Sequence, residues 1–463
     1  MASSKRLKIA IIGAGPAGCT FARLLIHNDV PVDVTIFEGE KSLDARSQGG
    51  TLDLHKESGL EAMRRCGLYE KFLEYARFDG EAFTVANKDL KKFICMAGTD
   101  EKSRLETRRN CRTFHTTFLN CSTIMASKGT LLLTGANGGI ATGFVSQFLK
   151  SPHASQYKGY YTVRDPASAS TIRNILESSN ASSHEYEIAP LDMSTLESTR
   201  KGAAAINKRV AEGTLPPIRA LVLNAGVQDS KLDFTADGIE RVFAINYLHQ
   251  FLLVLLLLQS MDREHGRIVL IGSTSAFPDW WPNKSTYKTE EQKLAFTNID
   301  EVAKGKRVID NEFEAAQRRY GGSKVLMIMF MHELQRRLNT DPLLHNISIL
   351  GLDPGWVTTS ISRHNPPTIK AIMATFQYLA PLFNLVWPNH FLRTARKTGD
   401  DLVRVCFADS FGEFPKAVYV DGAEVGGRVN GEVLDVGKRG ELWEGSLRFA
   451  GVGEGDTVLV DWK

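Results

Sequence analysis

Two segments of this chain share one pattern: an apolar β-rich run, a glycine turn and a run with helical periodicity. The first spans residues 8–27, with Gly13, Gly15 and Gly18 in its turn, and the second spans residues 130–149. A strand of this kind needs neighbouring strands and helices on both faces of the sheet to be stable. The sequence therefore predicts α/β architecture, and the amount of sheet that follows each turn decides which unit can fold.

After the second turn, strands and helices alternate regularly. The expected strands are 130–134, 159–163, 186–190, 219–223, 267–271 and 346–351, and the expected helices are 139–150, 168–179, 195–212, 238–260 and 314–339. This alternation predicts a Rossmann-type, doubly wound parallel sheet. Segment 276–319, rich in Pro, Trp and charges, interrupts the pattern, and we expect an insertion that lies over the surface.

The first turn is followed by much less. A second strand, Val32–Phe37, ends at Glu38; a helix is expected from about Glu57 to Tyr75, with weaker strand signals up to about Phe93. These elements predict an incomplete Rossmann-like βαβ unit. The chain is therefore divided into this partial unit at 1–109, a patternless linker at 110–124 and a large domain at 125–463.

Composition and charge limit the partners and the cellular compartment that this chain can have. Lys and Arg number 56 against 53 Asp and Glu, a net charge of +3 that argues against nucleic acid as a partner. The six Cys form no C-x-x-C pair, so neither a metal site nor a disulfide framework is indicated, and we expect reduced thiols in the cytoplasm. The longest apolar run, Phe251–Leu258, is too short to span a membrane and predicts a buried helix.

The second glycine turn reads TGANGGIA at residues 134–141. Glycines here let the backbone approach a pyrophosphate, whose charge then lies at the positive end of the helix. The candidate nucleotide-binding residues are Thr134, Gly135, Asn137, Gly139 and Ile140. Glycine turns between strand and helix are also common without a ligand, so this assignment depends on the motifs that follow.

Further motifs follow in a fixed order. They are Asp192 after the third strand, LNAG at 223–226, Asn246, Ser273 in IGSTS, YGGSK at 320–324 and DPGWVTT at 353–359. With them, residues 125 to about 460 resemble a short-chain dehydrogenase/reductase. The sequence departs from the family at Ala141 and Leu223, and in the 47-residue separation of Ser273 and Tyr320, which is unusually long.

The resemblance implies a nicotinamide cofactor and a set of residues that bind it. Besides the glycine turn, the matching positions are Asp192, Asn224, Ala225, Gly226, Pro354, Gly355, Val357 and Thr359. It also implies that Lys324 holds the nicotinamide ribose and that Asn246 holds a water that feeds protons to Lys324.

Four residues are the candidate catalytic group: Asn246, Ser273, Tyr320 and Lys324. A tyrosine hydroxyl titrates at about pH 10 in water. Lys324, one helical turn after Tyr320, would place an ammonium beside that hydroxyl and favour the phenolate. Ser273, at the end of a strand, can donate a hydrogen bond to a carbonyl as charge develops on it. The alternatives are that Ser275 is the donor, or that Tyr320 and Lys324 are only a solvated pair on a helix.

The choice of nicotinamide depends on the end of the second strand of the large domain. Arg164 would accommodate a 2′-phosphate, whereas Asp165 would bind a ribose 2′-hydroxyl. Because Arg164 comes first, NADP is favoured, with NAD the alternative.

A strongly apolar stretch covers residues 371–388. It fits a lid over a hydrophobic substrate or a surface that touches a membrane interface. Helix packing or a homo-oligomer contact explains it equally well.

The first glycine turn is a complete dinucleotide fingerprint: Gly13, Gly15 and Gly18, then Glu38 twenty residues later for a ribose hydroxyl. With Ala45-Arg46 and the run from Gly49 to His55, this segment resembles the start of FAD-dependent aromatic-ring hydroxylases, most of all their tetracycline-modifying branch. The resemblance implies FAD near Arg46. It ends near Arg109, before the family's other flavin and substrate elements, so a remnant without cofactor is an equal alternative.

These observations favour one function over two others. The leading hypothesis is NADP(H)-dependent interconversion of a ketone or aldehyde and an alcohol, on a hydrophobic small molecule, by residues 125–463. The second is a flavin-dependent monooxygenase. The third is that the first unit is a non-catalytic docking remnant, in a chain that joins two coding regions.

Overall fold

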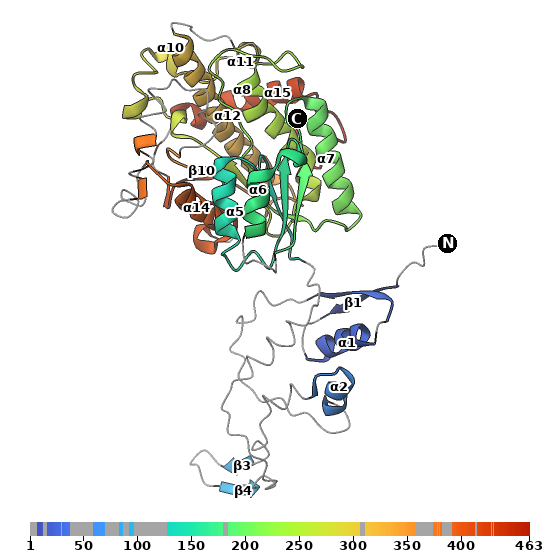
Figure 1. The fold of residues 1–463 in the computed structure, drawn as a ribbon. Coiled ribbons are helices and arrows are strands. Elements are labelled where there is room, and N and C mark those ends of the chain that lie inside the picture. Colours follow the sequence, from blue (N-terminus) through green and yellow to red (C-terminus); the bar gives the residue numbers. More distant parts are fainter. Residues whose placement is uncertain are drawn as a thin grey trace. The chain divides into compact units, whose positions relative to one another are not determined.

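The computed structural model describes residues 7–12, 16–28, 30–37, 59–69, 83–86, 92–96, 127–178, 184–305, 311–357, 374–376, 378, 380–381, 391–412, 414–426, 428 and 430–463. Contacts divide the chain into two compact units, Met1–Ala126 and Ser127–Lys463 (Figure 1).

The large unit is built on an eight-stranded sheet. Its strands are β5 (Thr130–Leu133), β6 (Lys158–Val163), β7 (Tyr186–Pro190), β8 (Ile218–Leu223), β9 (Arg267–Ile271), β10 (Ser348–Asp353), β11 (Val418–Asp421) and β12 (Glu424–Val425). They lie in the order β12-β11-β10-β9-β8-β5-β6-β7, all parallel except β12. The predicted doubly wound Rossmann-type sheet is confirmed, with its switch point at β5.

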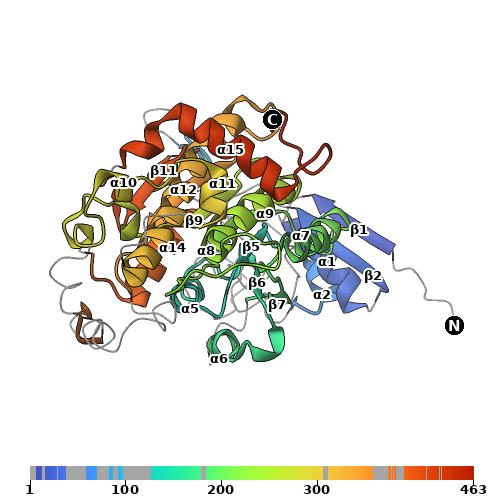
Figure 2. The same cartoon turned by 90° about the horizontal axis from the view of Figure 1, so that it is seen from above.

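Helices cover both faces of this sheet, as the view in Figure 2 shows. One layer holds α5 (Gly139–Phe148), α6 (Ser170–Ser178) and α14 (Ala395–Phe407), and the other holds α7 (Leu196–Ala211), α9 (His249–Leu257), α12 (Glu312–Thr340) and α15 (Val436–Ala450). Alternate residues of each strand enter opposite layers: Leu131 and Leu133 pack with α5, and Leu132 packs on the other face. Burial on both faces explains why these strands are continuously apolar.

The most apolar helix is part of the core. The chain runs through α8 (Arg241–Phe243), a π-helical turn η2 (Ala244–Leu248), α9 and the 3-10 turn η3 (Leu258–Ser260). Every residue of α9 is buried, so the predicted buried helix is confirmed. Residues 241–260 are long and apolar enough to cross a membrane, but 94% of their most apolar window is buried in the protein.

The expected surface insertion is wrong in two respects. It contains η4 (Thr274–Ala276), η5 (Trp281–Asn283), α10 (Glu290–Lys293) and α11 (Ile299–Ala303), and its last residues already belong to α12. Phe277, Phe296 and Ile299 are buried and join the main core. Ile299 and Ala303 give α11 a buried face, which the surrounding charges conceal in the sequence, and Phe296 is buried just before this helix.

The C-terminal part adds two strands that the sequence does not signal. β11 and β12 are short and extend the sheet beyond β10. Among the described residues there are also the 3-10 turns η1 (Pro166–Ser168), η7 (Asp409–Phe411) and η8 (Gly431–Leu434).

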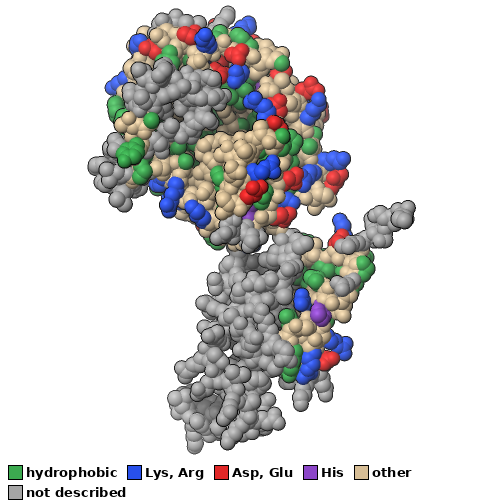
Figure 3. Space-filling model, in the orientation of Figure 1, with side chains coloured by type: hydrophobic (Ala, Val, Ile, Leu, Met, Phe, Trp, Pro, Cys, Tyr) green, Lys and Arg blue, Asp and Glu red, His purple; other side chains and the backbone are tan. Residues whose placement is uncertain are grey.

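On the face drawn in Figure 3, acidic and basic side chains of the large unit are interspersed rather than segregated.

Trp356 and Leu392 form a parallel bridge after β10. The Trp356 amide donates to the Phe391 carbonyl at 2.6 Å, and the Arg393 amide donates to the Trp356 carbonyl at 3.2 Å. The segment between Trp356 and Leu392 therefore begins and ends at the same place, just after β10. The apolar stretch 371–388 falls between these ends, and twelve of its eighteen residues lie outside the described residues.

The small unit contains a parallel pair, β1 (Leu7–Ile12) and β2 (Val32–Phe37), with α1 (Pro16–His27) and α2 (Gly59–Arg65), and an antiparallel pair, β3 (Phe83–Ala86) and β4 (Lys92–Met96). The helix predicted over 57–75 is interrupted, and residues 70–75 lie outside the described residues. α2 ends at Arg65, because Gly67 has a φ of +68° and the Leu68 amide bonds back to the Met63 carbonyl at 2.9 Å.

The nucleotide-binding residues predicted in the small unit are mostly beyond the described part of the chain. Gly18 lies in the first turn of α1. Gly13, Gly15, Glu38 and Arg46 and the linker 110–124 lie outside the described residues.

Candidate active site

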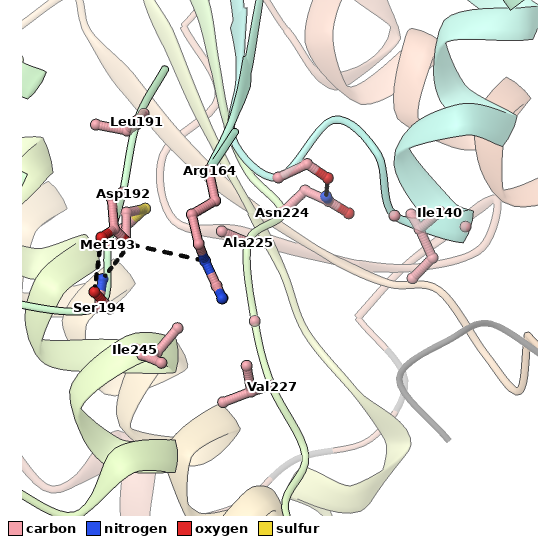
Figure 4. A pocket seen from close by; sticks show the side chains of 14 residues that line it. Ile140, Arg164, Leu191, Asp192, Met193, Ser194, Asn224, Ala225, Val227 and Ile245 are labelled. Atoms are coloured by element: carbon pink, nitrogen blue, oxygen red, sulfur yellow. Dashed lines mark hydrogen bonds and ion pairs between the residues drawn. The ribbon is translucent and has the colours of Figure 1, made fainter. Parts of the chain in front are cut away.

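A pocket opens at the carboxyl ends of β5 and β8, where the strand order reverses. Its lining consists of Gly135, Gly138, Gly139, Ile140, Arg164, Leu191, Asp192, Met193, Ser194, Asn224, Ala225, Gly226, Val227 and Ile245 (Figure 4). Nucleotides bind at such a switch point in open α/β sheets. Eight of the fourteen cofactor residues predicted in the large unit therefore meet in one place. With them lie hydrophobic residues that flank Asp192 and Asn246 in the sequence and carry no motif of their own.

The geometry of the glycine turn fits a nucleotide. Gly135 has a φ of +63°, and a Cβ there would lie 2.9 Å from the Ala225 Cα. The Asn224 side chain donates to the carbonyls of Thr134 and Gly135 at 2.9 and 3.0 Å, and so holds the turn against β8. The turn is thus fixed at the start of α5. No described side chain caps the start of this helix, so its first backbone amides can bind a phosphate.

Two predicted residues of this turn do not line the pocket. The Thr134 hydroxyl is buried, where it donates to the Val222 carbonyl and accepts from the Asn224 and Ala225 amides. The Asn137 carboxamide accepts from the Ile172 amide at 3.2 Å, near the start of α6. Because their side chains form hydrogen bonds within the protein, both residues stabilise the turn and do not face the pocket.

Arg164 and Asp165 diverge at the end of β6. Arg164 extends into the pocket between Asp192 and Ala225, with its Nε 3.8 Å from the Asp192 carboxylate (Figure 4). Its side chain is 73% exposed. Asp165 is not in the lining: its carboxylate accepts from the Ala167 amide at 2.9 Å and caps η1.

Tyr320, Ser273 and Lys324 lie together beside this pocket. The carboxyl end of β9 carries Ser273, and α12 crosses it with Tyr320 and Lys324 one turn apart. Lys324 is 4% exposed, its Nζ donates to the Ile271 carbonyl at 2.9 Å, and it lies 5.7 Å from the centroid of the Tyr320 ring. The alternative of a solvated helix pair is therefore wrong.

Burial sets the ionisation of both groups. Burial raises the pKa of the Tyr320 phenol to about 12, and a hydrogen bond with the Ser273 side chain acts against that rise. Burial lowers the pKa of the Lys324 ammonium to about 8, and the Asp353 carboxylate acts against that fall. Since Ser273, and not Ser275, is the serine whose side chain acts on the Tyr320 phenol, Ser273 is favoured as the donor to a carbonyl.

Asn246 lies in the π-helical turn and is fully buried. Its Nδ2 donates to the Val227 carbonyl at 2.9 Å and to the Ser323 hydroxyl at 3.0 Å, and its Oδ1 accepts from the Val227 amide at 2.7 Å. Both amide N–H groups therefore bond within the protein, and the predicted water at Asn246 stays a prediction. It ties the loop after β8 to α12, beside Lys324.

The end of β10 carries the remaining predicted residues. Gly355 has a φ of +69° and its amide donates to the Asp353 carboxylate at 2.9 Å. The Pro354 carbonyl accepts from the Thr398 hydroxyl at 3.0 Å, and Val357 is buried. None of these lines the pocket, and Thr359 lies outside the described residues.

Aromatic side chains cluster next to Ser273. The Trp356 indole donates to the Thr274 hydroxyl at 3.1 Å, and its ring centroid is 5.0 Å from that of Phe391. Trp280 lies 5.4 Å from Phe391 in an edge-to-face contact, and Trp281 is 67% exposed beside them. Trp280 and Trp281 belong to the segment that was expected to lie over the surface, and no motif in the sequence indicates this cluster.

Within the described part of the chain, no three His, Cys, Asp or Glu side chains come together as a metal site.

Known proteins match the large unit most extensively. Residues 129–290 match the family model described as short chain dehydrogenase. A short-chain dehydrogenase of Talaromyces variabilis, iccH, is 37% identical over 366 residues, which cover 73% of this chain and 100% of that protein. The crystal structure of the angucycline C-6 ketoreductase LanV with bound NADP is similar with a TM-score of 0.45 and 14% identity, over 64% of this chain and 94% of that one.

A second kind of relative covers a short stretch. Monooxygenase asqM of Emericella nidulans is 38% identical over 106 residues, which are 22% of this chain and 24% of that protein. The relative from Talaromyces, by contrast, is matched over its whole length. The chain accordingly belongs to the short-chain dehydrogenase/reductase family.

Proposed function

We propose that this protein is an NADP(H)-dependent oxidoreductase that interconverts a ketone or aldehyde and an alcohol. The observation that carries the proposal is the meeting of Tyr320, Ser273 and Lys324 at the end of β9, beside a pocket built on the glycine turn of β5. A proton donor, a carbonyl-binding hydroxyl and an ammonium are the groups that carbonyl reduction needs from a protein.

Each of the three side chains has a task in reduction. Tyr320 keeps its proton throughout the neutral range, since its pKa is raised to about 12, and donates it to the substrate oxygen. The Ser273 hydroxyl donates a hydrogen bond to the same oxygen, and the Lys324 ammonium stabilises the phenolate that Tyr320 leaves. When bound, the nicotinamide supplies the hydride. The glycine turn, Ile140 and the loop 224–226 would hold the cofactor.

The preference for NADP is proposed from Arg164. Its guanidinium is in the pocket lining and forms one exposed, 3.8 Å contact with Asp192, so it can turn to a 2′-phosphate. Asp165, the residue that would select NAD, is occupied in capping η1.

A hydrophobic substrate is proposed from the aromatic cluster. Trp280, Trp281, Trp356 and Phe391 lie on the segments that follow Ser273 and Gly355, where a substrate would approach the catalytic hydroxyls. Aromatic rings bind apolar ligands, and flat ligands best of all.

For the small unit, we infer an origin in an FAD-dependent monooxygenase, which the 106-residue match to asqM supports. Residues 1–109 are proposed as a partial unit, either a docking remnant or a site for FAD, with 110–124 as linker and 125–463 as the reductase. We propose the cytoplasm as the setting, in keeping with the reduced thiols of Cys66 and Cys406.

The test is a substrate screen with the full chain. NADPH or NADH consumption is followed with polycyclic aromatic, monocyclic aromatic and aliphatic ketones and aldehydes, and the reverse reaction with the matching alcohols. We expect turnover with NADPH and aromatic carbonyls. Binding of NADPH without turnover of any of these compounds would contradict the proposal, and faster turnover with NADH would contradict the cofactor assignment.

A further inference from the structure

Two carboxylates and two guanidinium groups gather at the ends of β10 and β11, on the sheet face covered by α12. Because neighbouring strand residues point to opposite faces and Ile349 packs on the α12 side, Asp353 also extends from that side. Asp421 is its register partner in β11. Arg393 and Arg428, which come from segments after β10, lie between them.

The contacts fix the Asp353 carboxylate in one position. Its Oδ1 accepts from the Gly355 amide at 2.9 Å, and its Oδ2 lies 3.4 Å from Nη1 of Arg428. The same Nη1 lies 3.1 Å from Asp421, and Arg393 bonds to Asp421 at 2.6 Å and to the Asp353 backbone carbonyl at 2.8 Å. Asp353 is 0% exposed, so this is a charge shielded from solvent and oriented by its neighbours.

The same strand ends hold the catalytic lysine. Lys324 Nζ donates to the Ile271 carbonyl, and Ile271 is paired with Leu352 across β9 and β10. The Gly272 amide continues this pairing by donating to the Leu352 carbonyl at 2.7 Å. Asp353 is the next residue, so its carboxylate and the Lys324 ammonium extend over the same end of two adjacent strands.

The surroundings of both groups identify the charges that act between them. In the described part of the chain, Lys324 faces Tyr320 from its own helix, the Ile271 carbonyl from β9, Gly226 and Asn246 from the β8 side, and Asp353 from β10. Asp353 is the charged group among these.

On its other side, Asp353 faces the two arginines and Asp421, and it acts on Tyr320 and Tyr419. Burial and Asp421 raise the pKa of Asp353 to about 6, so it is ionised where Lys324 titrates.

We propose that Asp353 is a positioning residue for catalysis: its buried carboxylate keeps the proton on Lys324, and Arg428 limits how strongly it does so. The proposal rests on the proposed function. It adds to this site a negative charge that stabilises the protonated lysine from the side away from the cofactor pocket. Arg428 also stacks on Trp280, at 4.3 Å from the ring centroid, and so connects this charge to the aromatic cluster.

The test is the pH profile of kcat/KM for NADPH-dependent reduction by the full chain. In the unmodified protein, loss of the Lys324 proton should lower the rate as the pH rises through about 8. Asp353→Asn removes the negative charge, so this alkaline limb should move to lower pH by about one unit. Arg428→Gln removes a positive charge that competes for Asp353, so the limb should move to higher pH by a smaller amount.

Asp421→Asn is the matched control. Asp421 shares both arginines with Asp353 but does not act on Lys324, so its limb should stay in place even if the melting temperature falls as much as in Asp353→Asn. Equal limbs in the Asp353→Asn, Asp421→Asn and unmodified proteins would overturn the proposal. If circular dichroism shows that Asp353→Asn does not fold, an unmoved limb in Arg428→Gln overturns it instead.

A readout without turnover separates this proposal from the proposed function. Lys324 is assigned to hold the nicotinamide ribose, so NADPH binding, followed by its fluorescence, should weaken over the same pH range. If no carbonyl compound is turned over, the proposed function fails, and the shift of this binding curve in the same variants still decides the role of Asp353.

Discussion

Strands β1 and β5 both lead into a glycine turn and a helix, yet their burial is opposite. All four residues of β5 are buried, with β6 and β8 on its two edges. In β1 only Ile11 is buried, Ile12 is 92% exposed, and the described residues provide one neighbour, β2. A dinucleotide motif thus identifies a local conformation, whereas the strands that flank it decide whether a domain and a site are formed.

The small unit nevertheless has a modest core of its own. Cys19 and Ala22 of α1 pack with Ile36 of β2 and with Met63 and Cys66 at α2. This cluster is far smaller than either layer of the large unit. A two-stranded parallel sheet with so little buried apolar surface is a poor basis for independent stability.

The largest effect should come from Tyr320, the proposed proton donor of the large unit. Tyr320→Phe removes the proton donor and keeps the ring, so kcat should fall about 10³-fold or more, with NADPH affinity nearly unchanged. Steady-state kinetics and fluorescence titration measure the two effects. Tyr69→Phe in the small unit is the matched control and should leave both unchanged. Substantial residual turnover by Tyr320→Phe would remove Tyr320 from its role.

The two glycine turns can be compared directly through NADPH binding. Gly135→Val places a branched side chain at a φ of +63° and against the Ala225 backbone, so NADPH affinity should fall about 100-fold. The same change at Gly18, in the first turn of α1, should leave NADPH affinity unchanged. Equal losses from the two substitutions would mean that the units share one nucleotide site, contrary to the comparison drawn above.

A smaller effect should separate the two residues at the end of β6. Arg164→Asp should reduce the preference for NADPH over NADH by about 10-fold or more, because it replaces a partner of the 2′-phosphate by a repelling charge. Asp165→Asn should leave the preference unchanged and affect only the cap of η1. Dissociation constants for both cofactors provide the measurement. An unchanged ratio in Arg164→Asp would end the assignment.

The smallest effect should follow from removing the small unit. Residues 125–463 made alone should keep the reductase activity, since every strand of the eight-stranded sheet lies within them. Residues 1–124 made alone should neither melt cooperatively nor hold FAD, as judged by circular dichroism and flavin absorbance. A yellow, folded fragment would restore flavin chemistry as a candidate, and an inactive large fragment would make the small unit a part of the reductase.

The sequence was most informative where partners are close in the chain. The alternation of strands and helices predicted the sheet, and the motif placed Tyr320 and Lys324 four residues apart on one helix, where the structure has them. The motif and the strand end placed Ser273 just after β9, as observed. The glycine turn was only partly correct, since Asn137 and Thr134 have side chains that hydrogen-bond within the protein and not in the pocket.

What the sequence did not reveal depends on contacts between distant segments. Asp353 meets Arg393 and Arg428 only after β11 has been added to the sheet, and β11 has four residues, too few for a periodic signal. The burial of Ile299 and Ala303 was concealed for a related reason. Apolar residues scattered among charges show which side is buried only when the helix they form is known.

The bridge between Trp356 and Leu392 has a consequence for how this enzyme can be altered. Since Trp356 and Leu392 are bonded to each other, we expect that the segment between them can change in length and composition without displacing β10 or α14. Replacing that segment by one from a relative would exchange the neighbourhood of Trp356 and Phe391 while Ser273, Tyr320 and Lys324 stay in place. Substrate preference can therefore be altered through this segment, by evolution or in the laboratory, while the three side chains keep their positions.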